Sequence, residues 1–159
     1  MKGYASIIKG LSDTVPFVGP ESQERQNKIK YKARLGANES VFGPSPLALR
    51  AMEKASKKAW MYGDPENYEL KCAISNYHNV NIENIVVGEG IDGLLGYLVR
   101  LFVEPNVNVV TSKGAYPTFN YHVQGYGGVL NFVSYKNDFE DIEGLVEKAC
   151  NTQASIIYI

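Results

Sequence analysis

Short apolar runs alternate with amphipathic stretches from residue 85 onward, and this alternation restricts the fold more than any other feature of the chain. Runs typical of strands cover residues 85–87, 107–110, 129–133 and 154–159. Between them, apolar side chains recur at helical spacing over 91–103, over 117–124 and from Asp138 onward. Strands joined through helices by short loops form a parallel sheet with helices on both faces. The sequence therefore predicts an α/β fold in three layers.

The end of the sequence falls within the last of these runs. Residues 154–159 are apolar enough to predict a central strand that is buried on both faces. Because chain termini usually lie at the surface, a chain that stops at Ile159 is expected to be truncated within a larger domain.

The first part of the chain is less regular. Residues 1 to 27 are polar and interrupted by prolines, so we expect an irregular arm there. In the segment 28–35 apolar and basic residues alternate, which is typical of a half-exposed edge strand with its basic side chains in solvent. A stripe for nucleic acid is the alternative interpretation. Ser45-Pro46 and Asp64-Pro65 are start signals for two helices, the first of which is expected to reach Trp60.

The composition favours a soluble, cytoplasmic, globular protein. Of the 159 residues, 16 are Lys or Arg and 17 are Asp or Glu, so the formal net charge of -1 gives no reason to expect nucleic acid or an anionic membrane as a partner. No apolar run approaches the roughly 20 residues that span a bilayer. Cys72 and Cys150 are predicted to be buried, reduced thiols, with a disulfide between them as the alternative. His78 and His122 lack metal-ligand spacing, so no metal site is predicted.

A glycine-rich turn stands between the strand at 85–87 and the helix that follows. The segment 88–93, Gly-Glu-Gly-Ile-Asp-Gly, matches the pattern G-x-G-x-x-G. Glycines let the backbone approach a phosphate, and the helix N-terminus offers free N–H groups and a positive dipole end. A dinucleotide site would also need an acidic residue about 20 residues further on, but the next strand ends Val110-Thr111-Ser112. A plain glycine turn, with Asp92 as an ordinary helix cap, is the other alternative.

An aromatic residue follows the next strand. In open parallel sheets, ligands bind at the carboxyl ends of the strands, and Tyr116 lies there, directly before Pro117. The Tyr116 ring is placed to stack on a flat cofactor, although it is one of 11 tyrosines and a packing role stays open. Nearby, Lys113 is interpreted as a solvated loop residue.

Read together, four segments resemble the fold-type-I pyridoxal-phosphate (PLP) aminotransferases, and among them the histidinol-phosphate aminotransferase group. Residues 35–46, L-G-A-N-E-S-V-F-G-P-S-P, are similar to that group's L-N-x-N-E-N-P-Y/F-G-P-S-P. Residues 62–66 are similar to its Y-P-D-P stretch, 84–92 to its N-I-x-x-G-N-G-S-D-E, and 115–119 to its P-T-Y-S/P-x-Y/F. The order and spacing of the four agree with the family.

The resemblance implies a PLP site and assigns residues to it. Backbone N–H groups of Ile91 and Asp92, after Gly90, would bind the cofactor's phosphate, and Tyr116 would stack on its pyridine ring. Tyr62 would reach the phosphate of a neighbouring subunit's cofactor, which implies a homodimer with shared active sites.

Other implied features concern the substrate and the domains. Gly36 and Asn38 would lie near a small-molecule substrate, an amino donor or an oxo acceptor. Residues 1–45 would form the N-terminal arm and part of the small domain, and residues 46–159 would be the first, incomplete part of the large PLP-binding domain.

The sequence also departs from the family pattern. Gly36 replaces an Asn, Gly63 a Pro, Gly93 a Glu, and Ser40-Val41 an Asn-Pro pair, which loosens the assignment to histidinol phosphate. The family places its Schiff-base lysine beyond the position of Ile159, so no catalytic residue is assigned and the isolated chain is expected to be inactive. Two alternative functions stay open: an NAD(P)-dependent oxidoreductase domain that uses the 88–93 motif, and a non-catalytic binding module.

Overall fold

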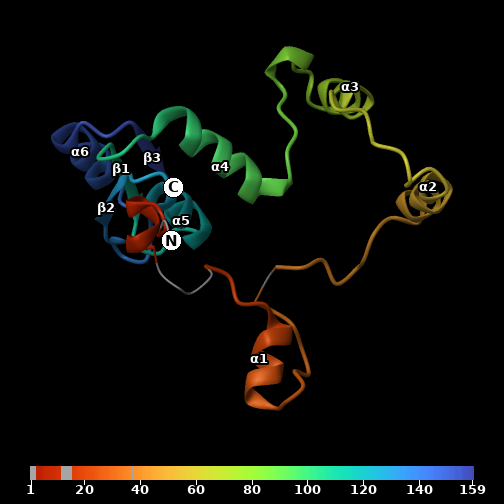
Figure 1. Ribbon diagram of the computed structural model, residues 1–159, viewed down its shortest axis with the longest axis horizontal. Coiled ribbons are helices and arrows are strands. Elements are labelled where there is room, and N and C mark those ends of the chain that lie inside the picture. Colours follow the sequence, from red (N-terminus) through yellow and green to blue (C-terminus); the bar gives the residue numbers. More distant parts are fainter. Residues whose placement is uncertain (1–2, 12–15, 37) are drawn as a thin grey trace. The chain divides into compact units, whose positions relative to one another are not determined.

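The computed structural model describes residues 3–11, 16–36 and 38–159 (Figure 1). The chain divides into two compact units. One unit combines the described part of residues 1–18 with Gly88–Ile159, and the other is Gly19–Val87.

The first unit is built on a three-stranded parallel sheet. Strand β1 (Asn108–Ser112) is central, with β2 (Val129–Val133) on one side and β3 (Ile156–Tyr158) on the other. Both pairings are parallel: Val109 of β1 lies opposite Leu130 of β2 and Ile156 of β3. The predicted parallel sheet is confirmed, and these strands lie where the apolar runs placed them.

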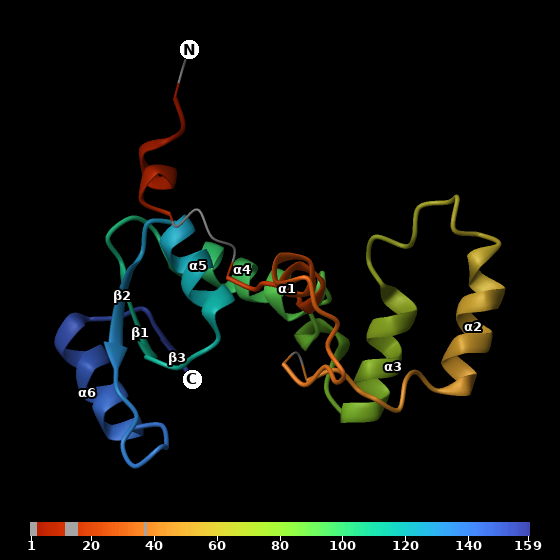
Figure 2. The ribbon, with the colours of Figure 1, turned by 90° about the horizontal axis from the view of Figure 1, so that it is seen from below.

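Helices cover both faces of this sheet, as Figure 2 shows. On one face lie α4 (Gly90–Phe102) and α5 (Pro117–Gly125), and on the other lies α6 (Ile142–Thr152). Val109 joins the α4 and α5 side chains in one buried cluster, which also contains Leu95, Val99, Val103, Phe119 and Val123. From α6, Leu145 is fully buried. The α/β fold with three layers is confirmed.

The N-terminal 3-10 turn η1 (Ser6–Gly10) packs on α5 in the same unit. Its Ile7 Cδ1 lies 2.9 Å from the point where a Cβ on Gly127 would stand. Gly127 has a φ of +78°, a conformation that favours glycine, so this residue permits both the turn after α5 and the contact with Ile7.

Three expectations for the first unit are wrong in detail. Helix α6 begins at Ile142 and not at Asp138, because Asp138 has a φ of +63° and the side chain of Asp141 caps the helix by accepting from Gly144 N at 3.1 Å. β3 is an edge strand and not a central one, so Ile157 keeps 39% of its surface exposed. Cys150 is exposed on α6 and was expected to be buried.

In the second unit the described residues form the helices α1 (Pro20–Asn27), α2 (Pro46–Ser56) and α3 (Tyr68–His78). A 3-10 turn, η2 (Ile82–Asn84), follows them. The start signal at Ser45 is confirmed, because Ser45 is the N-cap of α2 and its Oγ accepts from Leu47 N at 3.2 Å. The start signal at Asp64-Pro65 is wrong in position: α3 begins at Tyr68 with Asn67 as its N-cap residue, although the Asp64 carboxylate accepts from Tyr68 N at 2.9 Å. No side chain of α2 or α3 is buried, and Cys72 on α3 is only half-buried as a free thiol.

Several elements expected in this unit are different in the structure. Residues 20–27 form α1, because Pro20 at its first position suits a helix start, and α2 ends at Ser56, before Trp60. The predicted strand at 28–35 is absent from the described residues of that segment. Its alternation instead serves contacts with α1, where the Glu24 carboxylate accepts from Lys30 Nζ and from Tyr31 N, both at 2.9 Å.

The short strand expected at 85–87 is not formed either. Ile85 has extended φ and ψ angles of −113° and 122°, but it belongs to no ladder among the described strands. An extended backbone becomes a strand only when a neighbour supplies hydrogen bonds, so the apolar run alone was insufficient evidence. In the described parts of the chain, no helix combines the length and apolar character needed to cross a membrane.

Candidate functional site

The glycine turn at the start of α4 is the centre of the candidate site. Gly90 N donates to Gly88 O at 2.8 Å, and Gly90 has a φ of +75°, which favours glycine. A Cβ on Gly88 would lie 3.0 Å from Leu94 Cδ2, so this position is also tight. Because α4 begins at Gly90, the N–H groups of its first turn have no partner within the helix and carry the positive dipole end. This geometry suits the binding of an anion.

The loop after β1 brings Tyr116 to the same end of the sheet. Tyr116 is the residue directly before α5, with 40% of its surface exposed, and Pro117 fixes the first helical position. Lys113 N donates to Val133 O at 2.9 Å, which ties the loop to β2. The Tyr135 ring lies within 2.6 Å of the point where a Cβ on Gly114 would stand, so glycine is needed there for the ring to pack.

Tyr158, at the end of β3, was not identified from the sequence. Partial burial raises the pKa of its phenol, and the nearby Tyr116 and Asp92 raise it further. The Tyr158 ring stacks on Phe119 of α5, with centroids 4.0 Å apart and planes at 20°. Asp92 in the first turn of α4 and Tyr116 after β1 are therefore near enough to Tyr158, at the end of β3, to act on its phenol. The signal that could have identified Tyr158 is its place at the end of a predicted strand, because ligands bind at the carboxyl ends of parallel strands.

The other predicted site residues belong to Gly19–Val87. Tyr62 is fully exposed, with a relative exposure of 104%. Asn38 is also exposed and has a φ of +52°, and a Cβ on Gly36 would meet no atom within 4 Å. Within their own unit these three residues have open surroundings, and none is held by packing. Their roles stay predictions.

A hollow of about 370 Å³ lies beside β3 in the first unit. Side chains of α4, α5 and β3 line it, among them Leu98, Phe102 and Tyr158. The anion-binding turn at 88–92 and Tyr116 do not line it. The hollow is thus an apolar space next to the candidate site, below the edge that carries the tyrosines.

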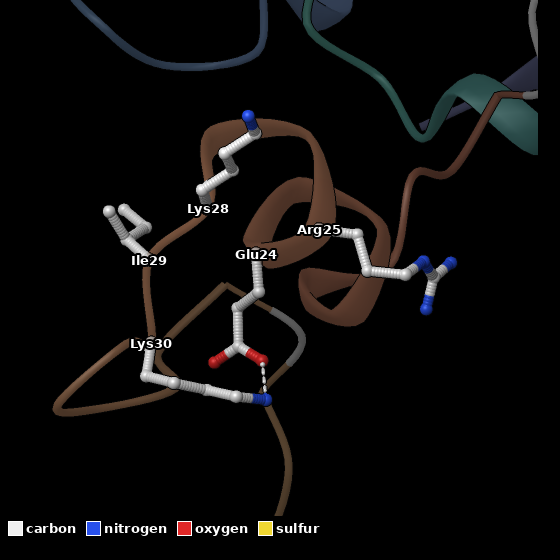
Figure 3. A pocket seen from close by; sticks show the side chains of 5 residues that line it. All are labelled: Glu24, Arg25, Lys28, Ile29 and Lys30. Carbon is white, nitrogen blue, oxygen red and sulfur yellow. Dashed lines mark hydrogen bonds and ion pairs between the residues drawn. The ribbon is translucent and has the colours of Figure 1, made fainter.

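A second hollow, of about 280 Å³, lies at the end of α1 in the other unit (Figure 3). Glu24 is its central group, with 8% of its surface exposed, and Figure 3 shows Lys30 reaching across to the Glu24 carboxylate. The hydrogen bond from Lys30, and then that from Tyr31 N, lower the pKa of Glu24. Because this carboxylate already accepts two hydrogen bonds, we assign Glu24 a structural role.

Among the described residues, no group of three or more His, Cys, Asp or Glu side chains is arranged to hold a metal ion.

Comparison with known proteins identifies relatives of the chain. No family model matches it. A histidinol-phosphate aminotransferase from Anaeromyxobacter sp. is 31% identical over 153 residues, which cover 96% of this chain and 42% of that protein. Histidinol-phosphate aminotransferase 1 from Nitrosococcus oceani is 28% identical over 155 residues, 98% of this chain and again 42% of the relative.

A solved structure matches over the whole chain. The crystal structure of histidinol-phosphate aminotransferase from Sinorhizobium meliloti in complex with pyridoxal-5'-phosphate is 48% identical, with a TM-score of 0.92, and covers 100% of this chain. The chain is a fold-type-I aminotransferase homologue. It spans about two fifths of the length of the relatives that it matches, since 42% of the Sinorhizobium chain is covered.

The aminotransferase relationship agrees with the site geometry. The glycine turn of residues 88–90, the open first turn of α4 and the exposed Tyr116 lie in the unit that carries the parallel sheet. The comparison does not favour a nicotinamide-dependent oxidoreductase as the function of the 88–93 motif.

Proposed function

We propose that this chain is part of a PLP-dependent aminotransferase, which transfers an amino group between an amino acid and an oxo acid or oxo-phosphate. One observation carries the proposal: the 48% identity over the full chain to a histidinol-phosphate aminotransferase whose structure contains pyridoxal-5'-phosphate. The substrates are a small-molecule amino donor and an oxo acceptor, the latter an oxo acid or an oxo-phosphate.

The residues of the first unit fit a phosphorylated pyridine cofactor. Backbone N–H groups of Ile91 and Asp92 would bind the phosphate, with Gly90 providing the turn, because a Cβ at Gly90 meets nothing within 4 Å and the approach is open. Tyr116 would cover one face of the pyridine ring. Ile91 contributes only its backbone, so its exposed side chain does not conflict with this role.

The second unit would contribute three residues. Tyr62 would contact the cofactor phosphate of a partner subunit in a homodimer, and its full exposure supports a contact outside its own unit. Gly36 and Asn38 would lie near the substrate. The domain assignment, arm and small-domain residues 1–45 and large-domain residues 46–159, and a cytoplasmic location belong to the same proposal.

The mechanism assigned to this chain is one of binding and orientation. When bound, PLP supplies the electron sink that makes amino-group transfer feasible. The first turn of α4 would neutralise the phosphate with N–H groups and the helix dipole and so fix one end of the cofactor. Tyr116 would fix the plane of the ring and exclude water from one face. No proton transfer is assigned to a residue of this chain.

The first prediction tests cofactor binding. Pyridoxamine 5'-phosphate is a suitable probe because it has no aldehyde to react with surface lysines. The chain is expected to bind it in calorimetric titrations, and Tyr116→Ala is expected to weaken binding about three- to tenfold by removing one stacking contact. Tyr126→Ala is the matched control, because Tyr126 is 39% exposed against 40% for Tyr116. Binding of NADH in place of this probe would contradict the proposal.

The second prediction concerns turnover. The 159-residue chain supplied with PLP, an amino donor and an oxo acceptor is expected to show no transamination above the rate of free PLP. The resemblance places the Schiff-base lysine beyond Ile159, and Lys113 is an exposed loop residue. A coupled assay of the oxo product measures this. Turnover that is lost in Lys113→Ala would contradict the assignment.

A further inference from the structure

Glu89 directly precedes α4, but its side chain does not cap the helix. No hydrogen bond joins it to the first-turn N–H groups. Instead Tyr97 Oη donates to Glu89 Oε2 at 3.1 Å. Residues four and eight positions apart lie on the same face of a helix. The Glu89 carboxylate therefore lies on the flank of α4 beside Gly93, without a hydrogen bond to the N–H groups of the first turn.

Gly93 makes this position of Glu89 accessible. It lies between Glu89 and Tyr97 on the same face, and a Cβ there would stand 2.8 Å from Glu89 Oε2. The Tyr97 ring is also fixed at the turn, because its Cε2 atom would lie 3.3 Å from a Cβ on Gly88. Two glycines and one tyrosine thus define the place of this carboxylate.

An unrestrained glutamate at this position would have an alternative site. A carboxylate is stabilised at a helix N-terminus by the free N–H groups and by the dipole. The phosphate of the proposed cofactor requires the same N–H groups of Ile91 and Asp92. Two anions cannot share these donors without strong repulsion, so the position of the Glu89 side chain matters for phosphate binding.

We propose that Tyr97 is a positioning residue that holds the Glu89 carboxylate on the flank of α4 and so keeps the first-turn N–H groups open for a phosphate. The inference rests on the proposed function, since it concerns the same anion site. Gly93, which replaces a Glu of the family pattern, is part of this arrangement, because a larger residue there would displace the Glu89 carboxylate. The hydrogen bond to Glu89 raises the pKa of Tyr97, so the phenol keeps its proton and continues to donate at neutral pH.

The test measures the affinity of the full chain for pyridoxamine 5'-phosphate by calorimetry in four proteins: unmodified, Tyr97→Phe, Glu89→Ala and the double variant. Tyr97→Phe is expected to weaken binding about three- to tenfold, the value of one hydrogen bond, because Glu89 is released to compete. In the Glu89→Ala background the same change is expected to have no effect. A merely structural role of Tyr97 would weaken binding equally in both backgrounds.

A second route to the same state uses Gly93→Ala, whose methyl group displaces the carboxylate without touching Tyr97. Gly93→Ala is expected to weaken the binding of pyridoxamine 5'-phosphate as Tyr97→Phe does, and to leave it unchanged in the Glu89→Ala background. Tyr126→Phe is the matched control for loss of a phenol hydroxyl on this unit, and far-UV circular dichroism checks folding of every variant.

The outcomes separate the two proposals. If the unmodified chain binds and all variants bind equally well, the positioning role is overturned and the proposed function stands. If the unmodified chain does not bind pyridoxamine 5'-phosphate, the proposed cofactor site is overturned and the positioning role with it. A loss in Tyr97→Phe and Gly93→Ala that disappears in the Glu89→Ala background supports the inference.

Discussion

Phe119→Ala is expected to reduce the free energy of unfolding of the sheet-containing unit by about 3–5 kcal/mol. Phe119 keeps 1% of its surface exposed and belongs to the buried cluster between α4, α5 and the sheet. Its ring also stacks on Tyr158, which is only half-buried on the edge strand β3. The substitution would leave a cavity and would remove the aromatic contact that holds the end of β3. Urea unfolding followed by far-UV circular dichroism measures the loss.

Phe139→Ala is the matched control, because Phe139 lies in the same unit with 76% of its surface exposed. A change within about 0.5 kcal/mol is expected for it. Because the Phe119 ring supports Tyr158, Phe119→Ala should also change the near-UV circular dichroism of the tyrosines. Equal losses in the two variants would contradict the core described here.

The sequence predicted the sheet-containing unit well because its periodicity reflects burial. β1 (Asn108–Ser112) lies between two helical layers, so four of its five residues are buried. Its valines Val109 and Val110 made the run 107–110 recognisable, although Thr111 and Ser112 are buried as well. Asp138 was a misleading helix start, since a cap is defined by its backbone and Asp138 has positive φ while Asp141 does not. Local composition identified the element but could not choose between two aspartates three residues apart.

The second unit shows the opposite case. The alternation at 28–35 has the period of a strand, but a strand needs a neighbour with free hydrogen-bonding groups. Glu24, on α1, accepts from Lys30 and from Tyr31 N instead. No pattern within 28–35 contains this information, because the decisive acceptor lies outside the segment. The strand predicted at 85–87 was wrong for the same reason, because no neighbouring strand pairs with it in the described sheet.

For the candidate site, the sequence identified residues whose role depends on the backbone and missed those whose role depends on tertiary contacts. The 88–93 glycines and the position of Tyr116 before Pro117 are readable from the motif and from the helix start signals. Tyr158 acquires its place only when β3 pairs with β1 and its ring meets Phe119. Likewise, Glu89 and Tyr97 are eight residues apart, and only the absence of a side chain at Gly93 lets them meet.

Gly128→Ala is expected to destabilise the same unit by about 1–3 kcal/mol through overpacking. A Cβ at this position would lie 2.5 Å from Val103 Cγ1 and 2.8 Å from Val123 Cγ1. Both valines are buried, and a β-branched side chain has little rotamer freedom with which to move aside. The turn between α5 and β2 would therefore shift, although Gly128 N is held by Val123 O at 2.9 Å. Urea unfolding again gives the magnitude.

Gly125→Ala provides the control for this turn, because a Cβ there meets no atom within 4 Å and Gly125 is the last residue of α5. It is expected to be neutral or to stabilise by up to about 1 kcal/mol, since alanine restricts the unfolded chain. Adding Val103→Ala to Gly128→Ala should recover part of the loss, because the smaller side chain makes room for the new methyl group. Strictly additive losses in that pair would show that the two residues are not in contact, and the placement of β2 against α4 would then be wrong.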